Sequence, residues 1–356
     1  QQGLIGINAD SDWGLTTGNI NSPGGGIAIW ENSFTTAKNY SAHGGNLHVD
    51  VAGGLTLTQD AASVIDGTSS IVKRGLGTLI LNGENAVTGM FAGDGILQFN
   101  SLISTANSVS TGNYSIGGDV TLGGANNGTR YTGGTMRFNF TGTTTRTFIF
   151  NNNGNTNFAG GIDVTAGNTL TAGGIISQGS ELDYGFKTGT GTLITTAANT
   201  WRGVAMINGV LQFGNSTPWA NSTGTAADNT FVDMMGGTIR AINTGANIAL
   251  ANAASTTTYN YGGGMVLSLG SGAGFSAEMA ADNLIRQNQG TLVIQTEGAT
   301  TLGAAGNTNA ARLIVTNVIN ASLARASGLN NGIFPAHLIG ADASGAGFFL
   351  QNNVTT

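Results

Sequence analysis

The sequence predicts an all-β chain that folds as a right-handed parallel β-helix, a β-solenoid built of tandem modules. The prediction rests on internal repetition, on short runs in which apolar and polar residues alternate, and on 59 glycines with few charged residues. A chain of 356 residues exceeds the usual size of a single core, so it forms either two domains or one elongated fold. Repetition favours the elongated fold, because a solenoid grows by adding copies of one unit.

The composition excludes several other classes of protein. Hydrophobic residues make up 40% of the chain, which is too many for a disordered glycine-rich tract, and three prolines are too few for collagen. The net charge of −6 and the 12 scattered basic residues argue against nucleic-acid binding. No apolar run approaches the roughly 18 residues of a membrane-spanning helix. The absence of cysteine excludes disulfides and thiol chemistry.

The main internal repeat joins two segments of 28 residues without a gap. KRGLGTLILNGENAVTGMFAGDGILQFN begins at Lys73, and KTGTGTLITTAANTWRGVAMINGVLQFG begins at Lys187, an offset of 114 residues. Besides these lysines, the shared positions that we take as structural motif residues are Gly75, Gly77, Thr78, Leu79, Asn85, Gly89, Gly95, Leu97 and Phe99 in the first copy, and Gly189, Gly191, Thr192, Leu193, Asn199, Gly203, Gly209, Leu211 and Phe213 in the second.

Two weaker echoes extend the repeat. RQNQGTLVIQTEGATTLG from Arg286 resembles the start of both copies, and GGTMRF from Gly133 resembles GGTIRA from Gly236. These matches indicate tandem modules of roughly 100 residues in one continuous solenoid. The predicted parts are N-terminal coils over 1–69, a first module over 70–186, a second over 187–285, and a degenerate module with the C-terminal segment over 286–356.

Within the modules, apolar residues alternate with polar ones, as at Leu47, Val49 and Val51, which predicts strands. Glycine- and asparagine-rich turns separate the strands. The window SAEMAADNLIRQ, from Ser276 to Gln287, has a helix-like composition, but the third repeat places its end where a strand begins. We therefore favour a strand there over a helical turn.

Stacked coils explain the low charge of the chain. At roughly 20 to 25 residues per coil, each strand lies about 4.8 Å from its equivalent in the next coil. Identical charges in that arrangement would repel, so outward positions favour Thr, Ser and Asn, whose side chains hydrogen-bond along the stack.

The two repeat units resemble the autotransporter-associated, or passenger-associated, β-strand repeat of large bacterial surface proteins. That repeat reads G-x-G-T-L-x-L, then Asn, then Gly, then x-G-x-L, and the stretches from Gly75 to Leu97 and from Gly189 to Leu211 fit it. The second copy departs from it at Thr195, where the pattern has an aliphatic residue. NNGIFPAHLIGADASGAGFFLQNN, from Asn330, is similar to a segment between repeats in very large members of the family.

The resemblance implies an extracellular or bacterial cell-surface location and a structural or adhesive, non-catalytic role. The expected partners are other copies of the chain, joined end to end or laterally into a fibre or sheath, or surface glycans and other surface proteins. No cofactor is expected. The alternative is a carbohydrate-binding or polysaccharide-cleaving β-helix, because enzymes of that class share the fold.

The enzyme alternative needs clustered catalytic groups. The candidate carboxylate pairs are Asp10 with Asp12, Glu181 with Asp183, and Asp50 with Asp60, none of which has a basic cluster beside it in the sequence. We interpret them as solvated turn residues and expect no catalytic site.

Metal and sugar sites are equally weakly indicated. The three histidines His43, His48 and His337 lack a companion with metal-ligand spacing, so no metal site is expected. GGD at Gly117 and AGDG at Ala92 do not continue a calcium-binding period and are interpreted as turns. The four tryptophans would stack on sugar rings if exposed, and they are Trp13, Trp30, Trp201 and Trp219.

Overall fold

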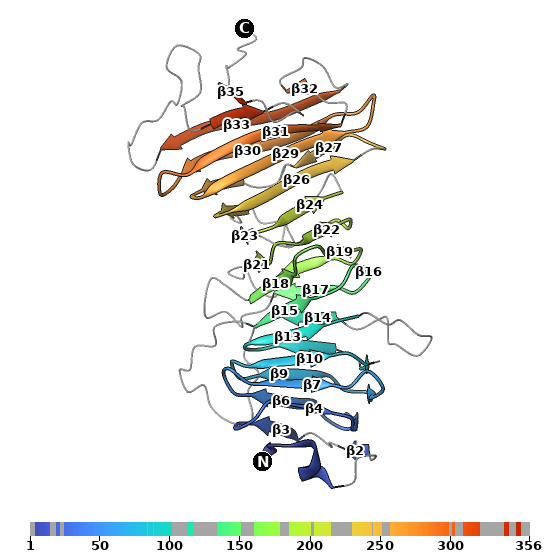
Figure 1. The fold of residues 1–356 in the computed structure, drawn as a ribbon. Helices are drawn as coiled ribbons and strands as arrows, with labels where there is room; N and C mark the ends of the chain where they lie inside the picture. The colour runs from blue at the N-terminus through green and yellow to red at the C-terminus, as the bar shows by residue number, and fades with distance from the viewer. Residues whose placement is uncertain are drawn as a thin grey trace. The chain divides into compact units, whose positions relative to one another are not determined.

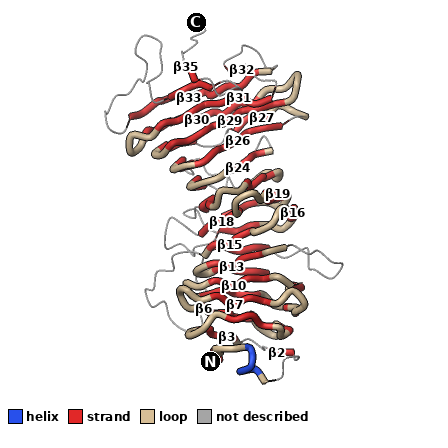
Figure 2. Tube along the Cα trace, in the orientation of Figure 1, coloured by secondary structure: helices blue, strands red, loops and turns tan. Residues whose placement is uncertain are grey.

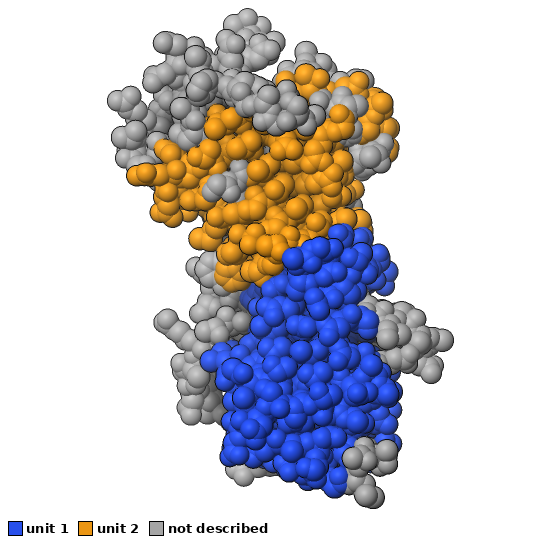
Figure 3. Space-filling view, in the orientation of Figure 1, with its two compact units in different colours: residues 1–185 blue, residues 186–356 orange. Residues whose placement is uncertain are grey.

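The computed structural model describes residues 4–14, 19–21, 25–83, 85–87, 89–101, 113–116, 134–150, 160–178, 185–200, 203–214, 230–243, 245–250, 257–298, 301–302, 309–320, 338–341 and 347–349. The described part is almost entirely β-strand, with one short 3₁₀ helix, η1 (Asp10–Trp13), near the N-terminus (Figures 1 and 2). The chain divides into two compact units, residues 1–185 and 186–356 (Figure 3).

In unit 1, successive strands pass in turn through three faces. The first face is a sheet in the order β1 (Leu4–Gly6), β3 (Gly26–Ile29), β6 (Leu47–Val51), β9 (Ile71–Arg74), β12 (Gly89–Ala92), β14 (Asn113–Ile116), β17 (Phe148–Phe150) and β20 (Ile176–Gln178). The second is β4 (Phe34–Thr36), β7 (Thr56–Gln59), β10 (Thr78–Leu81), β13 (Ile96–Phe99), β15 (Thr135–Phe138) and β18 (Gly160–Val164). The third holds β2 (Asn19–Asn21), β5 (Asn39–Ser41), β8 (Ile65–Asp66) and β11 (Asn85–Ala86), and further along the chain β16 (Gly142–Thr144) pairs with β19 (Thr169–Ala172).

Unit 2 has two main faces. The first is β21 (Gly185–Thr188), β23 (Gly203–Met206), β25 (Thr230–Met234), β28 (Thr257–Tyr261), β30 (Ala277–Arg286), β33 (Ala310–Asn320) and β32 (Thr301–Leu302), with β27 (Ile248–Leu250) also on β30. The second is β22 (Thr192–Thr195), β24 (Val210–Phe213), β26 (Gly237–Asn243), β29 (Gly264–Ser271), β31 (Thr291–Gly298), β34 (Leu338–Ala341) and β35 (Gly347–Phe349).

Neighbouring strands in both units run parallel, apart from the antiparallel pair of β34 and β35. Strands that follow one another in the sequence belong to different sheets, and each pairs with its equivalent one coil away. This arrangement confirms the parallel β-helix that the sequence predicts. The expected right-handed winding is the general preference of parallel crossover connections.

Coil length differs between the units. In unit 1, Ile27 pairs with Val49 and Val49 with Lys73, so a coil advances 22 and then 24 residues, within the predicted range. In unit 2, Ala241 pairs with Leu269 and Leu269 with Thr296, a spacing of 28 and then 27 residues. The coils of unit 2 are longer because β29, β30, β31 and β33 contain 8 to 11 residues.

The core of each unit consists of inward side chains stacked in register. On the second face of unit 1, Leu57, Leu79, Leu97 and Met136 lie in one column and are all at most 2% exposed. In the neighbouring column, the rings of Phe99 and Phe138 stack with centroids 5.3 Å apart. Complete burial of such a side chain contributes about 1.5–3 kcal/mol, so the columns supply most of the stabilisation.

The helix-like window from Ser276 to Gln287 forms strand β30, as favoured from the repeat. Its burial alternates from Ala277 through Ala281. Pairing with β28 on one side and β33 on the other outweighs the helix propensity of its Ala, Glu and Met residues.

The turns that precede β13 and β24 require glycine. Gly95 and Gly209 have φ of +61° and +73°, and an added Cβ would lie 2.4 Å from a carbonyl oxygen, that of Gly77 and of Gly189 respectively. Gly54 has φ of +80° but open space around it. These glycines therefore separate the cost of a left-handed backbone from the cost of close packing.

We expect Gly54→Ala to lower the free energy of unfolding by about 1–2 kcal/mol, the cost of a left-handed residue with a Cβ. Gly95→Ala and Gly209→Ala add a steric clash and should cost about 3–5 kcal/mol. Urea unfolding followed by circular dichroism measures all three. Equal losses for Gly54→Ala and Gly95→Ala would contradict the close packing of this turn.

Candidate functional site

The two 28-residue copies have the same strands at the same positions. Strands β9, β10, β12 and β13 of the first copy correspond to β21, β22, β23 and β24 of the second, and every boundary is displaced by 114 residues. The repeat in the sequence is therefore a repeat in structure, from the first strand to the last.

Each copy contains a lysine that points into the core. In the first copy, Lys73 follows Ile71 on the inward side of β9 and is 0% exposed. Its Nζ donates hydrogen bonds to the carbonyl oxygens of Arg74 at 2.6 Å, Gly75 at 2.7 Å and Asp94 at 3.3 Å. We call this group the first lysine site. It joins the turn after β9 to the turn after β12, which lies one coil further along.

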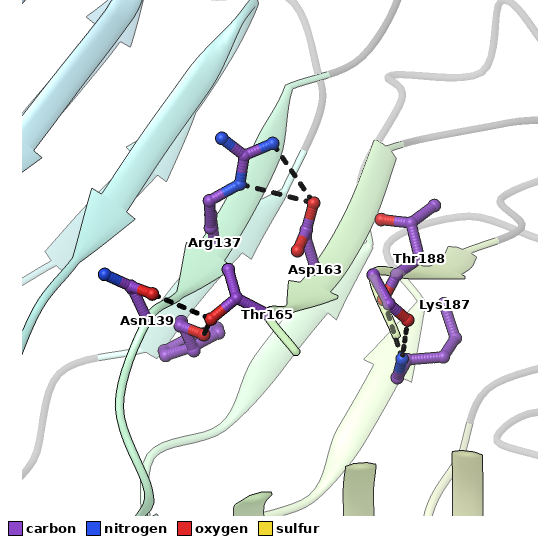
Figure 4. Close-up of polar contacts among 8 residues, drawn as sticks. Arg137, Asn139, Asp163, Thr165, Lys187 and Thr188 are labelled. Carbon is purple, nitrogen blue, oxygen red and sulfur yellow. Dashed lines mark hydrogen bonds and ion pairs between the residues drawn. The ribbon is translucent and has the colours of Figure 1, made fainter. Parts of the chain in front are cut away.

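The second lysine site repeats the first. Lys187 is 1% exposed, and its Nζ donates to the carbonyl oxygens of Thr188 at 2.6 Å, Gly189 at 3.0 Å, Gly191 at 3.1 Å and Asn208 at 3.3 Å (Figure 4). Thr188, Gly189 and Asn208 occupy the positions of Arg74, Gly75 and Asp94. The ammonium thus has the same acceptors in both copies.

The third, weaker copy keeps the cation with different chemistry. Arg286 replaces lysine, and its guanidinium donates to the carbonyl oxygens of Gly290 and Gln289, both at 2.9 Å. Asn288 has φ of +46° where Gly75 and Gly189 have +72° and +69°. Asparagine tolerates a left-handed backbone better than most residues, which explains how the turn persists without that glycine.

Burial dominates the electrostatics of the first lysine site. Loss of solvation lowers the pKa of Lys73 from its ordinary value of 10.5 to about 8, although the carboxylates of Asp50 and Asp94 act in the opposite direction. At neutral pH the lysine remains an ammonium ion. Its donated hydrogen bonds and the nearby carboxylates compensate in part for the cost of burying the charge.

The other motif residues have structural positions around these sites. Leu79, Leu97, Phe99, Leu193, Leu211 and Phe213 are inward core residues, Gly75, Gly95, Gly189 and Gly209 form left-handed turns, Gly77 and Gly191 accept hydrogen bonds from Ile96 and Val210, Thr78 and Thr192 begin β10 and β22, and Gly89 and Gly203 begin β12 and β23. None of them lines a ligand-sized opening in the described part of the chain.

The shared asparagine has a buried role. Asn85 Nδ2 donates to Oε1 of Gln59 at 3.2 Å and to the carbonyl oxygen of Gly83 at 2.9 Å. Gln59 is 1% exposed, and its Nε2 donates to Asn85 Oδ1 at 2.9 Å and to the carbonyl oxygen of Ser63 at 3.0 Å. The equivalent Asn199 is 0% exposed. The motif asparagine therefore satisfies polar groups inside a turn and does not reach a surface site.

Outward polar side chains form a column along unit 1. Asn100 Nδ2 donates to Asn82 Oδ1 at 2.6 Å, Asn139 Nδ2 donates to Asn100 Oδ1 at 3.1 Å, and Thr165 Oγ1 donates to Asn139 Oδ1 at 2.8 Å (Figure 4). Each residue follows a strand of the second face. The hydrogen-bonded ladder expected from the composition is present here.

A second outward column carries charge and occurs in both units. In unit 1, Arg137 forms an ion pair with Asp163 in the next coil, 3.2 Å apart (Figure 4). In unit 2, Arg240 Nη1 donates to Gln212 Oε1 at 2.6 Å. Its Nε donates to a carboxylate oxygen of Glu297 at 2.8 Å.

These arginines stand at equivalent positions of the GGTMRF and GGTIRA echoes. Burial would raise the pKa of Glu297, but hydrogen bonds from Arg240 and Ser268 and the charge of Arg240 hold that pKa below its ordinary value. The arginine and carboxylate groups of these columns are thus engaged with each other.

The structure assigns ordinary partners to the candidate carboxylates that it describes. Asp12 accepts the backbone N–H groups of Asn8 and Ala9 at 2.7 and 3.0 Å, as a turn-capping residue does. Asp60 accepts the N–H of Ala62 at 2.8 Å, while Asp50 acts on the first lysine site. Glu181 and Asp183 lie outside the described residues.

The described histidines lie apart in environment. His43 is exposed in a turn, whereas His48 is 4% exposed in β6, where burial and the charge of Arg74 lower its pKa below the ordinary value. His337 lies outside the described residues. Within those residues, no group of three or more His, Asp and Glu side chains could hold a metal ion.

The two described tryptophans differ in exposure. Trp13 packs edge-on against Tyr40, with ring centroids 6.3 Å apart, whereas Trp30 is 63% exposed. Trp201, Trp219 and the GGD turn at Gly117 lie outside the described residues. Asp94 of the AGDG turn contributes its carbonyl oxygen to the first lysine site, which is a structural role.

The interior of unit 1 offers little room for a ligand. A cavity among Ile27, Tyr40, Leu57, Gln59 and Leu79 has a volume of about 10 Å³. That volume is near the minimum that holds one water molecule.

Comparison with models of known families, with curated proteins and with solved structures finds no match to this chain. Among the described residues, no helix has the length and apolar character needed to cross a membrane.

Sequence reasoning missed the lysine sites. It used Lys73 and Lys187 only as matching letters, yet both occupy an inward position of an alternating strand directly before G-x-G. A charged residue at an inward position in two copies is the signal that could have revealed them. The chain has three lysines, and Lys38 is also only 1% exposed.

We expect Lys73→Met to lower the free energy of unfolding by about 2–4 kcal/mol, because three buried carbonyl groups lose their donor. Lys187→Met should act alike in the second copy, since its acceptors are equivalent. Chemical unfolding of each variant measures the loss. Variants as stable as the original chain would show that the ammonium ions contribute nothing to stability.

The lowered pKa of Lys73 predicts how stability depends on pH. Between about pH 8 and pH 10, the unfolded chain binds a proton that the folded chain does not, so the free energy of unfolding should rise by about 2 kcal/mol. Above pH 10 it should fall, because burial raises the pKa of Tyr40 to about 12 and the unfolded tyrosine ionises first.

The control for this pH profile is Lys73→Met, which should lose the rise between pH 8 and pH 10 and keep the fall above it. Urea titrations at several pH values measure both profiles. Coincident profiles for the two proteins would contradict the assignment to Lys73.

Proposed function

We propose that this chain is a non-catalytic structural or adhesive β-solenoid module of an extracellular or bacterial cell-surface protein, similar to autotransporter-associated repeat proteins. The observation that carries the proposal is that the outward side chains of successive coils bind one another. The column from Asn82 to Thr165 and the pairs of Arg137 with Asp163 and Arg240 with Glu297 all follow this pattern.

Such columns suit a scaffold better than a catalytic site. A catalytic carboxylate must be free to act on substrate, whereas Asp163 and Glu297 are engaged by arginines of neighbouring coils. The columns add side-chain hydrogen bonds between coils to the backbone bonds, which stabilises a folded chain exposed to proteases and to changing salt.

Self-association is the finer part of the proposal. Ile5 lies in register with the core residues Ile27 and Val49, but on the first strand of unit 1 it is 61% exposed. An exposed member of a core column is a contact surface for another copy. The 3₁₀ helix η1 covers a different part of this end, where Trp13 lies against Tyr40.

One observation favours the second candidate, a carbohydrate-binding β-helix. Trp30 is 63% exposed, and Leu76, which follows a strand two coils further along the same face, is 68% exposed. An exposed aromatic ring beside an aliphatic side chain can stack on a sugar.

A combined assay separates the two candidates. The structural proposal predicts that protease treatment of intact producing cells removes the protein, and that the purified chain releases no reducing ends or unsaturated sugars from a panel of polysaccharides. A cytoplasmic location or such products would contradict it. Retention on a polysaccharide column that Trp30→Ala abolishes and Leu47→Ala, a core control, does not would favour the carbohydrate candidate.

A further inference from the structure

The turn after β23 contains a reactive dipeptide held in an unusual environment. Asn208 is exposed, and the backbone N–H of Gly209 donates to Asn208 Oδ1 at 2.7 Å. Because Oδ1 is bonded to Cγ, the nitrogen of Gly209 lies beside the side-chain carbon of Asn208. Gly209 has no Cβ to hinder the approach of that nitrogen, and its φ is +73°.

The second lysine site acts on the same peptide group. Lys187 Nζ donates to the carbonyl oxygen of Asn208 at 3.3 Å, and this oxygen belongs to the peptide whose nitrogen is that of Gly209. Loss of the N–H proton places negative charge on the nitrogen and the oxygen together. A buried ammonium at the oxygen therefore favours the deprotonated peptide, which is the nucleophilic form.

We infer that Asn208 and Gly209 form a self-modification site at which Asn208 is converted to aspartate, assisted by Lys187. A base in solvent removes the N–H proton of Gly209, the nitrogen bonds to Cγ of Asn208, and the side-chain nitrogen leaves as ammonia after taking a proton from water. Water then opens the cyclic imide, so one water is consumed and one ammonia is released. No oxidant or cofactor is needed.

The first copy shows that the fold accepts the product. Asp94 occupies the position of Asn208, precedes Gly95 as Asn208 precedes Gly209, and contributes its carbonyl oxygen to Lys73 at the same distance of 3.3 Å. Its carboxylate favours the charged form of the buried lysine. Conversion of Asn208 gives the second lysine site the carboxylate that the first already has.

The chain contains a matched control in Asn82 and Gly83. The N–H of Gly83 donates to Gln59 Oε1 at 3.2 Å, and Asn82 Oδ1 accepts from Asn100 at 2.6 Å. The glycine nitrogen is thus directed to another side chain, and the asparagine amide is held in the outward column. The same dipeptide should therefore be unreactive at this position.

The test follows both dipeptides in one sample. The folded chain is incubated in mildly alkaline buffer, digested, and examined by mass spectrometry for the gain of about one mass unit that replaces NH₂ by OH. Asn208 should convert at least about tenfold faster than Asn82, and the ratio should approach unity in urea, where both sites lose their surroundings. Equal rates in the folded chain, or a ratio unchanged by urea, would overturn the inference.

A pair of variants tests the contribution of Lys187. Lys187→Met should slow the conversion of Asn208 to about one tenth of its original rate, whereas Lys73→Met, the same change in the first copy, should leave it unaltered. A folded Lys187→Met protein that converts Asn208 at the original rate would overturn the role of the lysine. If that variant does not fold, the comparison of folded and urea-unfolded chain decides the question. This inference does not depend on the proposed function.

Discussion

The structure depends above all on register, the rule that each residue lies beside its equivalent one coil away. Parallel pairing imposes this rule on the backbone, and the side chains then have no choice of neighbour. Inward positions must pack against similar inward positions, as Leu79 does against Leu97. Outward positions must tolerate similar outward positions, which explains why asparagine ladders and alternating Arg and Asp replace the ordinary charged surface of a globular protein.

Register also explains how much the sequence could predict. Because each coil repeats the demands of the last, repetition and alternation identify the parallel β-helix, the turn glycines and the core positions such as Leu97 and Phe213. The helix-like segment from Ser276 is a strand because its neighbours in register are strands. Pair partners within the outward columns were not predictable. Arg240 reaches Glu297, 57 residues away, only because loops of unequal length bring their coils together.

The lysine sites follow from the same rule in a less familiar way. A β-helix must turn between faces, and in each copy the turn points several carbonyl oxygens toward the interior. Water cannot reach these oxygens, so a donor must come from the core side. Lysine provides a long apolar stem that lies among aliphatic neighbours and an ammonium that donates to several carbonyls at once. Where the third copy uses arginine, fewer carbonyls of its turn are bound, in keeping with its divergent sequence.

Native-state labelling with an amine-reactive reagent tests the central claim most directly. A slip of register by one residue would move Lys73 and Lys187 from the inside to the outside of their strands. The account predicts that none of the three lysines is modified in the folded chain and that all three react after unfolding. Rapid modification of Lys73 or Lys187 in the folded protein would contradict the register on which the fold, the lysine sites and the polar columns depend.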